Sequence, residues 1–114
     1  MSAETLASVL GAFARNELGG VADRFAEHGA YREARKPPIQ GRAAIAAEFA
    51  RFAASGVPFR FTVEDVIESA GRACVVYRFA TAGGSGEPWR ERAGCAIVRF
   101  DEQGQIAEWR EYEG

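Results

Sequence analysis

Apolar residues recur at helical spacing along the first part of the chain. Over residues 3–18 this repeat predicts an amphipathic helix that buries one face. Its members are Leu6, Val9, Leu10 and Phe13. A shorter repeat follows the Gly19-Gly20 pair and ends near Gly29, so we expect a second, shorter helix there. Its members are Val21, Ala22 and Phe25.

Residues 30–35 form a short stretch of mixed polarity. They precede Lys36-Pro37-Pro38, a segment that interrupts regular secondary structure. Proline fixes its own φ and restricts the residue before it, so we expect a short edge strand followed by a loop. An alanine-rich stretch over residues 42–54 resumes the helical spacing and stops before Gly56, a residue type common just after a helix. This predicts a third helix, whose apolar face carries Ile45, Phe49 and Phe52.

Beyond Pro58 the apolar period changes to two, which is typical of strands. The alternation slips near Glu64-Asp65, which predicts a β-bulge. Turn-forming residues at 69–72, 82–86 and 101–104 divide the rest into four strands of an antiparallel meander. The predicted fold is α+β in the order ααβαββββ, with three N-terminal helices packed on a curved antiparallel sheet in one domain, residues 1–114.

Hairpin pairing around these turns predicts which side chains share a sheet face. It places Trp109 opposite Ala96, Glu111 opposite Gly94, and Cys74 opposite Cys95. One face then mixes aromatic, small and charged groups, which is unusual for a core and typical of a pocket. Its members are Tyr77, Arg92, Gly94, Ala96, Trp109 and Glu111. We expect Gly94 to leave space beside Glu111.

The opposite sheet face is also largely apolar. Helices can cover only one face, so we expect a second copy of the chain to cover the other and to form a homodimer. Its members are Cys74, Val76, Trp89, Ala93, Cys95, Ile97, Ile106 and Tyr112.

Charge and cysteine content exclude several classes of partner. Fourteen basic and sixteen acidic residues nearly balance, without a basic cluster suited to phosphates, so we expect no nucleic acid partner. The chain shows no membrane-span or export-signal pattern, so we expect a cytoplasmic protein without membrane contact. The two cysteines lack metal-binding spacing, so we expect reduced, buried thiols, no metal site and no cofactor.

Four segments, in their order and spacing, resemble the NTF2-like superfamily, in particular its SnoaL-like branch. That branch includes ketosteroid isomerases, polyketide cyclases and limonene-epoxide hydrolases. The resemblance implies a cone of helices on a strongly curved sheet, a pocket for a small apolar molecule, and a dimer through the outer sheet face. The segments span nearly the whole chain and are residues 25–33, 41–45, 98–101 and 104–112.

The resemblance to ketosteroid isomerases is incomplete at the catalytic positions. Glu33 matches the acidic residue that serves those enzymes as general base in an apolar cavity. The positions of their two oxyanion donors fall at Val9 and Ala96, which cannot donate hydrogen bonds from their side chains. Steroid isomerisation is therefore not expected.

The segment Trp109-Arg110-Glu111-Tyr112 resembles Trp-Arg-Asp-Tyr of limonene-epoxide hydrolases. Its acid belongs there to an Asp-Arg-Asp set that activates water and protonates the epoxide, which implies that role for Glu111. The matching Arg-x-Asp pattern reads Arg78-Phe79-Ala80 here, so the second carboxylate is missing. Glu33 is a substitute only if it approaches Glu111.

Two classes of function remain open. The first is a cofactor-independent isomerase, lyase or hydrolase of a small apolar carbonyl or epoxide compound, with Glu111 or Glu33 as acid/base and Arg92 orienting it. The second is a non-catalytic module for hydrophobic-ligand binding or dimerisation. The residues expected to line the ligand pocket are Trp109, Tyr77, Phe13, Phe25, Phe49 and Gly94.

Each charged candidate also has a purely structural interpretation. Glu111 equally fits a structural ion pair with Arg92 across two strands. Glu33 lies between basic residues on the predicted edge, where charge commonly discourages association between sheets. His28, the only histidine, more often caps the end of a helix than catalyses.

Overall fold

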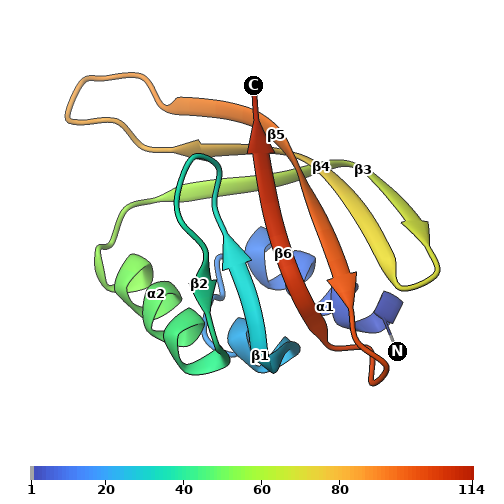
Figure 1. The fold of residues 1–114 in the computed structure, drawn as a ribbon. Coiled ribbons are helices and arrows are strands. Elements are labelled where there is room, and N and C mark those ends of the chain that lie inside the picture. The colour runs from blue at the N-terminus through green and yellow to red at the C-terminus, as the bar shows by residue number, and fades with distance from the viewer. Residues whose placement is uncertain (1) are drawn as a thin grey trace.

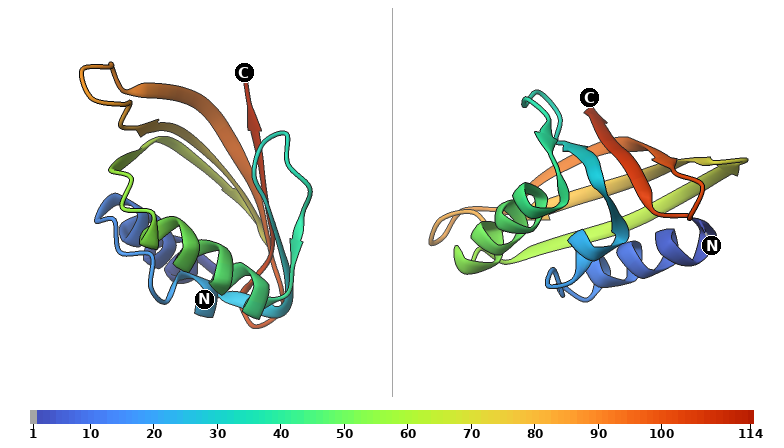
Figure 2. Two further views of the ribbon diagram at one scale, coloured as in Figure 1. Left: turned by 90° about the vertical axis from the view of Figure 1, so that its left-hand side faces the viewer. Right: turned by 60° about the horizontal axis from the view of Figure 1, so that its bottom comes forward.

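The structure is a computed structural model and describes residues 2–114. One strongly curved sheet wraps over two helices and a short 3-10 turn, which all lie on its concave side (Figure 1). Figure 2 shows the helices from the side, with the long strands bending over them. The helical elements are α1 (Ser2–Ala14), η1 (Val21–Arg24) and α2 (Arg42–Ala54). The strands are β1 (Phe25–Arg32), β2 (Ile39–Gln40), β3 (Phe59–Ser69), β4 (Arg72–Thr81), β5 (Arg90–Phe100) and β6 (Ile106–Glu113).

The six strands lie in the order β2-β1-β6-β5-β4-β3. All neighbours are antiparallel except β1 and β6, which run parallel. The prediction of a purely antiparallel sheet is therefore wrong. Strands β1 and β6 are separated by most of the sequence, so no hairpin turn fixes their relative direction.

The prediction of a second helix between Gly20 and Gly29 is also wrong. Only Val21–Arg24 is helical, as a 3-10 turn, and Phe25–Arg32 is a strand with β2 outside it, so β1 is not the sheet edge. At Gly29 a Cβ atom would lie 2.9 Å from the backbone oxygen of Ile106, so glycine allows β1 to approach β6. Pairing with β6 outweighs the short helical repeat. His28 consequently lies exposed on a strand rather than at a helix end.

Other predicted features are confirmed. Helix α2 spans residues 42–54 and is followed by Gly56 with φ of 70°. The pairing of β3 with β4 shifts between Val63 and Asp65, where the bulge was expected. Turns separate the last four strands at the three predicted places.

The predicted strand register is wrong by two residues in both C-terminal hairpins. Trp109 pairs with Val98, Glu111 with Ala96, and Gly94 lies between Tyr77 and Glu113. Side chains alternate between faces with a period of two, so an even error leaves the predicted face unchanged for residues 108–113 of β6 and their partners, but not for Ile106, which lies beyond a register shift. The register shift between Arg99 and Phe100 is the irregularity that simple pairing could not anticipate.

The core lies between the concave sheet face and the helices. Helix α1 contributes Leu6, Val9 and Phe13, and α2 contributes Ile45 and Phe49. They pack with sheet residues that include Val75, Tyr77, Ala96, Val98, Ile106 and Trp109. Ile106 therefore belongs to the core. The prediction that it lies on the outer face is wrong.

The convex face keeps exposed apolar side chains. The exposed fractions of Ile67, Tyr112 and Trp89 are 61%, 45% and 41%. Strand pairing aligns two rows on this outer-face patch, Ile67–Cys74–Ile97 and Val76–Cys95–Tyr112. Both cysteines are free. They are half-buried, whereas the prediction was that they are buried. Across residues 2–114, no helix is long and apolar enough to cross a membrane.

Candidate functional site

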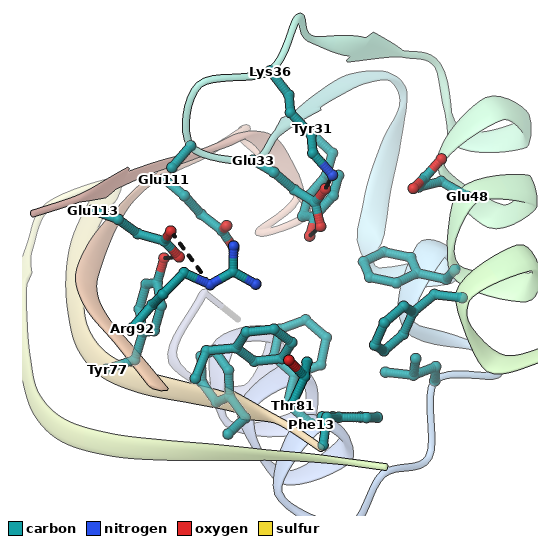
Figure 3. A pocket seen from close by; sticks show the side chains of 17 residues that line it. Phe13, Tyr31, Glu33, Lys36, Glu48, Tyr77, Thr81, Arg92, Glu111 and Glu113 are labelled. Atoms are coloured by element: carbon teal, nitrogen blue, oxygen red, sulfur yellow. Dashed lines mark hydrogen bonds and ion pairs between the residues drawn. The ribbon is translucent and has the colours of Figure 1, made fainter. Parts of the chain in front are cut away.

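A pocket of about 190 Å³ opens between the concave sheet face and the helices (Figure 3). Eight of the 17 residues that line it are aromatic, and its polar groups come from β4, β5, β6, α2 and the segment after β1. The aromatic members are Phe13, Tyr31, Phe49, Phe52, Phe59, Phe61, Tyr77 and Phe79. The polar members are Glu33, Lys36, Glu48, Thr81, Arg92, Glu111 and Glu113. An apolar wall with a few polar groups is the usual form of a small-molecule site.

The aromatic wall is held together by ring contacts between α1, β3 and β4. The Phe13 and Phe61 ring centroids lie 5.0 Å apart, and Phe61 stacks on Tyr77 at 5.1 Å. The Trp109 and Phe13 rings meet edge to face, with their centroids 5.7 Å apart. Such contacts add to the stability gained from area burial and fix the shape of the wall.

Glu111 projects from β6 into this apolar pocket. Its Oε2 accepts a hydrogen bond of 2.9 Å from the indole Nε1–H of Trp109. Burial is the main cause that raises the pKa of Glu111 to about 7; the charges of Glu33 and Glu113 also raise it, and the hydrogen bond from Trp109 opposes the rise. The carboxyl group therefore exists in both protonation states near neutral pH.

Glu33 lies in the same pocket rather than on a solvated edge. Its Oε2 accepts a hydrogen bond of 3.2 Å from the Tyr31 hydroxyl, and its Oε1 accepts one of 3.0 Å from Lys36 Nζ. The Glu33 side chain is 34% exposed. Burial, with the nearby Glu111 and Glu33 charges, raises the pKa of Tyr31 well above its usual value, so its hydroxyl remains a neutral donor.

Arg92 approaches Glu113, not Glu111. Its Nε lies 3.9 Å from Glu113 Oε1, and the Tyr77 hydroxyl donates a hydrogen bond of 3.2 Å to Glu113 Oε2. The Glu113 side chain is only 7% exposed. The sequence did not single out Glu113 as a site residue, although the period of two along β6 places it on the same face as Glu111 (Figure 3).

Three of the six residues predicted to line the pocket do so, namely Phe13, Phe49 and Tyr77. Trp109 lies behind the wall in the core, with none of its surface exposed, and Phe25 is buried against the edge of the Tyr31 ring. Glu48 and four phenylalanines of the wall were missed. Glu48 shares the α2 face of Ile45, Phe49 and Phe52, so helical spacing contained that signal.

Gly94 does not leave open space beside Glu111. A Cβ atom there would lie 2.4 Å from the Tyr112 carbonyl oxygen, 2.8 Å from Glu113 Cγ and 3.1 Å from the Tyr77 hydroxyl. The position is already filled by its neighbours. The expectation that Gly94 creates room in the pocket is therefore wrong.

The pocket brings Glu33 and Glu111 together, which the sequence left open, and surrounds them with neutral hydroxyl donors. This arrangement suits proton transfer to or from a small molecule. Within residues 2–114, no group of three or more His, Cys, Asp or Glu side chains is arranged to hold a metal ion.

Comparison with known proteins shows the family. The "putative polyketide cyclase" from Xanthomonas campestris pv. campestris is 20% identical, with a TM-score of 0.76 over 99% of this chain and 90% of that one. Bal32a, from a soil-derived mobile gene cassette, is 24% identical, with a TM-score of 0.79 over 98% of this chain and 88% of that one. No curated protein matches the chain. The model of the SnoaL-like domain matches residues 6–109, so the chain belongs to the SnoaL-like domain family, with the NTF2-like fold of its structural neighbours.

Proposed function

We propose that the protein binds a small, largely apolar carbonyl or epoxide compound in this pocket and that Glu111 acts on it as general acid and base. The reaction class is isomerisation, elimination or hydrolysis driven by proton transfer, with no cofactor taking part. Glu33 is the second carboxylate of the site, and Arg92 and the two tyrosines are its polar neighbours.

The observation that carries this proposal is the environment of Glu111. Its carboxyl group is held by Trp109 at the inner end of an aromatic pocket, and its pKa is raised to about 7. A general acid or base works best when its pKa is close to the working pH, because both forms are then available. An ordinary surface glutamate, with a pKa near 4.5, would be a weak base and almost never an acid at neutral pH.

The proposed chemistry follows from these two forms. As a carboxylate, Glu111 removes a proton from carbon next to a carbonyl group and can return it to another carbon of the same molecule. As a carboxylic acid, it donates its proton to an epoxide oxygen while water attacks the ring carbon, and Glu33 then accepts the proton from that water. The Glu33 carboxylate lines the same pocket, which supports its part in the second reaction.

The name of the Xanthomonas protein is compatible with this chemistry. Ring closure of a polyketide by condensation also begins with removal of a proton next to a carbonyl group.

The alternative is a binding module without catalysis. In its favour, Glu33 and Glu113 are each already close to a cation, Lys36 and Arg92 respectively. Glu111 differs, because it accepts its hydrogen bond from a neutral indole. An open, aromatic cavity favours ligand binding in either case over a pure dimerisation module, which we would expect to fill its cone with its own side chains.

Deuterium exchange tests the proposal without knowledge of the natural substrate. A panel of small ketones and epoxides is incubated with the protein in D₂O, and incorporation next to the carbonyl or opening of the ring is followed by NMR. We expect Glu111→Gln to slow the reaction by roughly 10²–10⁴-fold. Glu108→Gln removes an acid from the opposite face of β6 and serves as the matched control, with unchanged rates.

Equal rates for wild type and Glu111→Gln on every reactive compound would show that the assignment of Glu111 is wrong. Compounds that bind but never react would favour the binding module.

A further inference from the structure

Glu113 is a buried carboxylate at the very end of the last strand. Its side chain is 7% exposed. A carboxylate is costly to bury unless hydrogen bonds compensate it. The burial of Glu113 therefore needs a specific explanation.

Its contacts bring together three neighbouring strands. Tyr77 from β4 donates its hydroxyl proton to Glu113 Oε2 at 3.2 Å, and Arg92 Nε from β5 lies 3.9 Å from Oε1. The backbone at this end of β6 is held as well, because Arg35 Nη2 donates a hydrogen bond of 3.3 Å to the Glu113 carbonyl oxygen. Both the carboxylate and the backbone of Glu113 are thus held by neighbouring residues.

Gly94 is the position that allows Tyr77 and Glu113 to meet. It pairs with Tyr77 on one side and with Glu113 on the other. The distances from its absent Cβ, 2.8 Å to Glu113 Cγ and 3.1 Å to the Tyr77 hydroxyl, show that both side chains occupy the space a larger residue would need. Close approach of this kind is a recognised reason for glycine inside a strand.

The direction of the Tyr77 hydroxyl matters for Glu111, which also interacts with it. A phenol has one proton to donate. When that proton points to Glu113, the hydroxyl oxygen presents its lone pairs to Glu111 and can accept the proton of the Glu111 carboxyl group. When it is released from Glu113, Tyr77 can instead donate to the Glu111 carboxylate and stabilise that form.

We propose that Glu113 is a positioning residue for Glu111. Glu113 acts by holding the Tyr77 hydroxyl in one orientation and by keeping the Arg92 guanidinium close to its own carboxylate. Gly94 supplies the space in which this contact forms. The inference rests on the proposed role of Glu111 as acid and base, and Glu113 itself is not assigned a step in the reaction.

Carboxyl-carbon NMR titration of Glu111 tests this role. The titratable and charged groups around Glu111 in the pocket are Glu33, Tyr31, Tyr77, Glu113 and Arg92 (Figure 3). We expect Glu113→Gln to lower the titration midpoint of Glu111 from about 7 by on the order of one pH unit, because a like charge is removed and a neutral amide holds the Tyr77 proton less strongly than a carboxylate does. Glu108→Gln, on the outer face of the same strand, should leave the midpoint unchanged.

A double-mutant cycle separates positioning from charge alone. In a Tyr77→Phe background, Glu113→Gln should lower the Glu111 midpoint by clearly less than in the wild type, because the hydroxyl that Glu113 orients is absent. An equal shift in both backgrounds, or no shift in either, overturns the proposal. If Glu113→Gln does not fold, Glu113→Asp keeps the charge but withdraws it from Tyr77, and an unchanged Glu111 midpoint there has the same meaning.

These titrations need no substrate, so the two proposals fail separately. Loss of the Glu111 role in the exchange assay leaves the coupling measurable. A dependence of exchange on Glu111, together with an unchanged midpoint in Glu113→Gln, refutes only the positioning role.

Discussion

The indole Nε1–H of Trp109 donates a hydrogen bond to Oε2 of Glu111, two residues farther along β6, at 2.9 Å. Both side chains lie on the concave face because successive strand residues alternate between faces. Trp109 has no exposed surface, so it fixes one carboxylate oxygen against the core. The carboxyl group nevertheless lines the pocket.

Replacing Trp109 by phenylalanine should raise the pKa of Glu111 above its value of about 7. The indole hydrogen bond favours the carboxylate form, and phenylalanine cannot donate it. We also expect a loss of stability of about 2 kcal/mol, because a smaller ring leaves a cavity in the core. Carboxyl-carbon NMR gives the first quantity and urea unfolding the second. Trp89→Phe, at a half-exposed indole outside the pocket, is the control, and an unmoved Glu111 midpoint in Trp109→Phe would contradict the assigned hydrogen bond.

The raised pKa of Glu111 also predicts how stability depends on pH. Between the ordinary value of 4.5 and about 7, the folded protein keeps a proton that the unfolded chain has released. The unfolded state then binds fewer protons, so the free energy of unfolding falls as pH rises through this window. At about 1.4 kcal/mol per pH unit, the full loss is on the order of 3 kcal/mol.

Glu111→Gln should remove that loss. Urea unfolding at several pH values between 4.5 and 8 compares the variant with wild type, so that the contributions of other acids cancel. The wild type should lose more stability than Glu111→Gln across the window. Parallel curves would show that Glu111 titrates as an ordinary glutamate.

The outer-face patch predicts a homodimer. Ile67, Cys74 and Ile97 align across three strands, and Tyr112 lies in the next row with 45% of its surface exposed. Contiguous exposed apolar surface of this kind is usually covered by a partner. Light scattering should therefore give twice the chain mass for wild type, and Ile67→Asp should shift the protein to monomer with unchanged secondary structure by circular dichroism. A monomeric wild type at high protein concentration would refute the dimer.

The predictions from sequence succeeded where local chemistry determines the structure. Gly41 and Gly56 bound α2, and the change of period after Pro58 marks the strands. Hairpin turns also placed Tyr77, Glu111 and Trp109 on one face, because the register errors were even. The fold class and the pocket face could thus be predicted from short-range patterns.

The features that failed depend on contacts between distant segments. Phe25 belongs to a short repeat with helical spacing, but pairing with β6 makes it the start of a strand. Glu113 has no local sign of function, because its burial depends on Tyr77 and Arg92 from two other strands. Gly94 was correctly recognised as unusual, yet only the three-dimensional contacts show that its space is filled.

Gly94→Ala gives the most direct test of that contact. Alanine normally suits a strand interior better than glycine, by about 0.5–1 kcal/mol, because glycine loses more backbone entropy on folding. Here the new Cβ would lie 2.4 Å from the Tyr112 carbonyl oxygen, which is backbone and cannot rotate away. Overpacking of this kind costs about 1–3 kcal/mol, so the net effect should be destabilising. Gly19→Ala is the matched control, because nothing lies within 4 Å of its Cβ position, and its stability should change by less than about 0.5 kcal/mol. Urea unfolding measures both, and a Gly94→Ala protein as stable as wild type would show that β5 and β6 do not approach each other as closely as described.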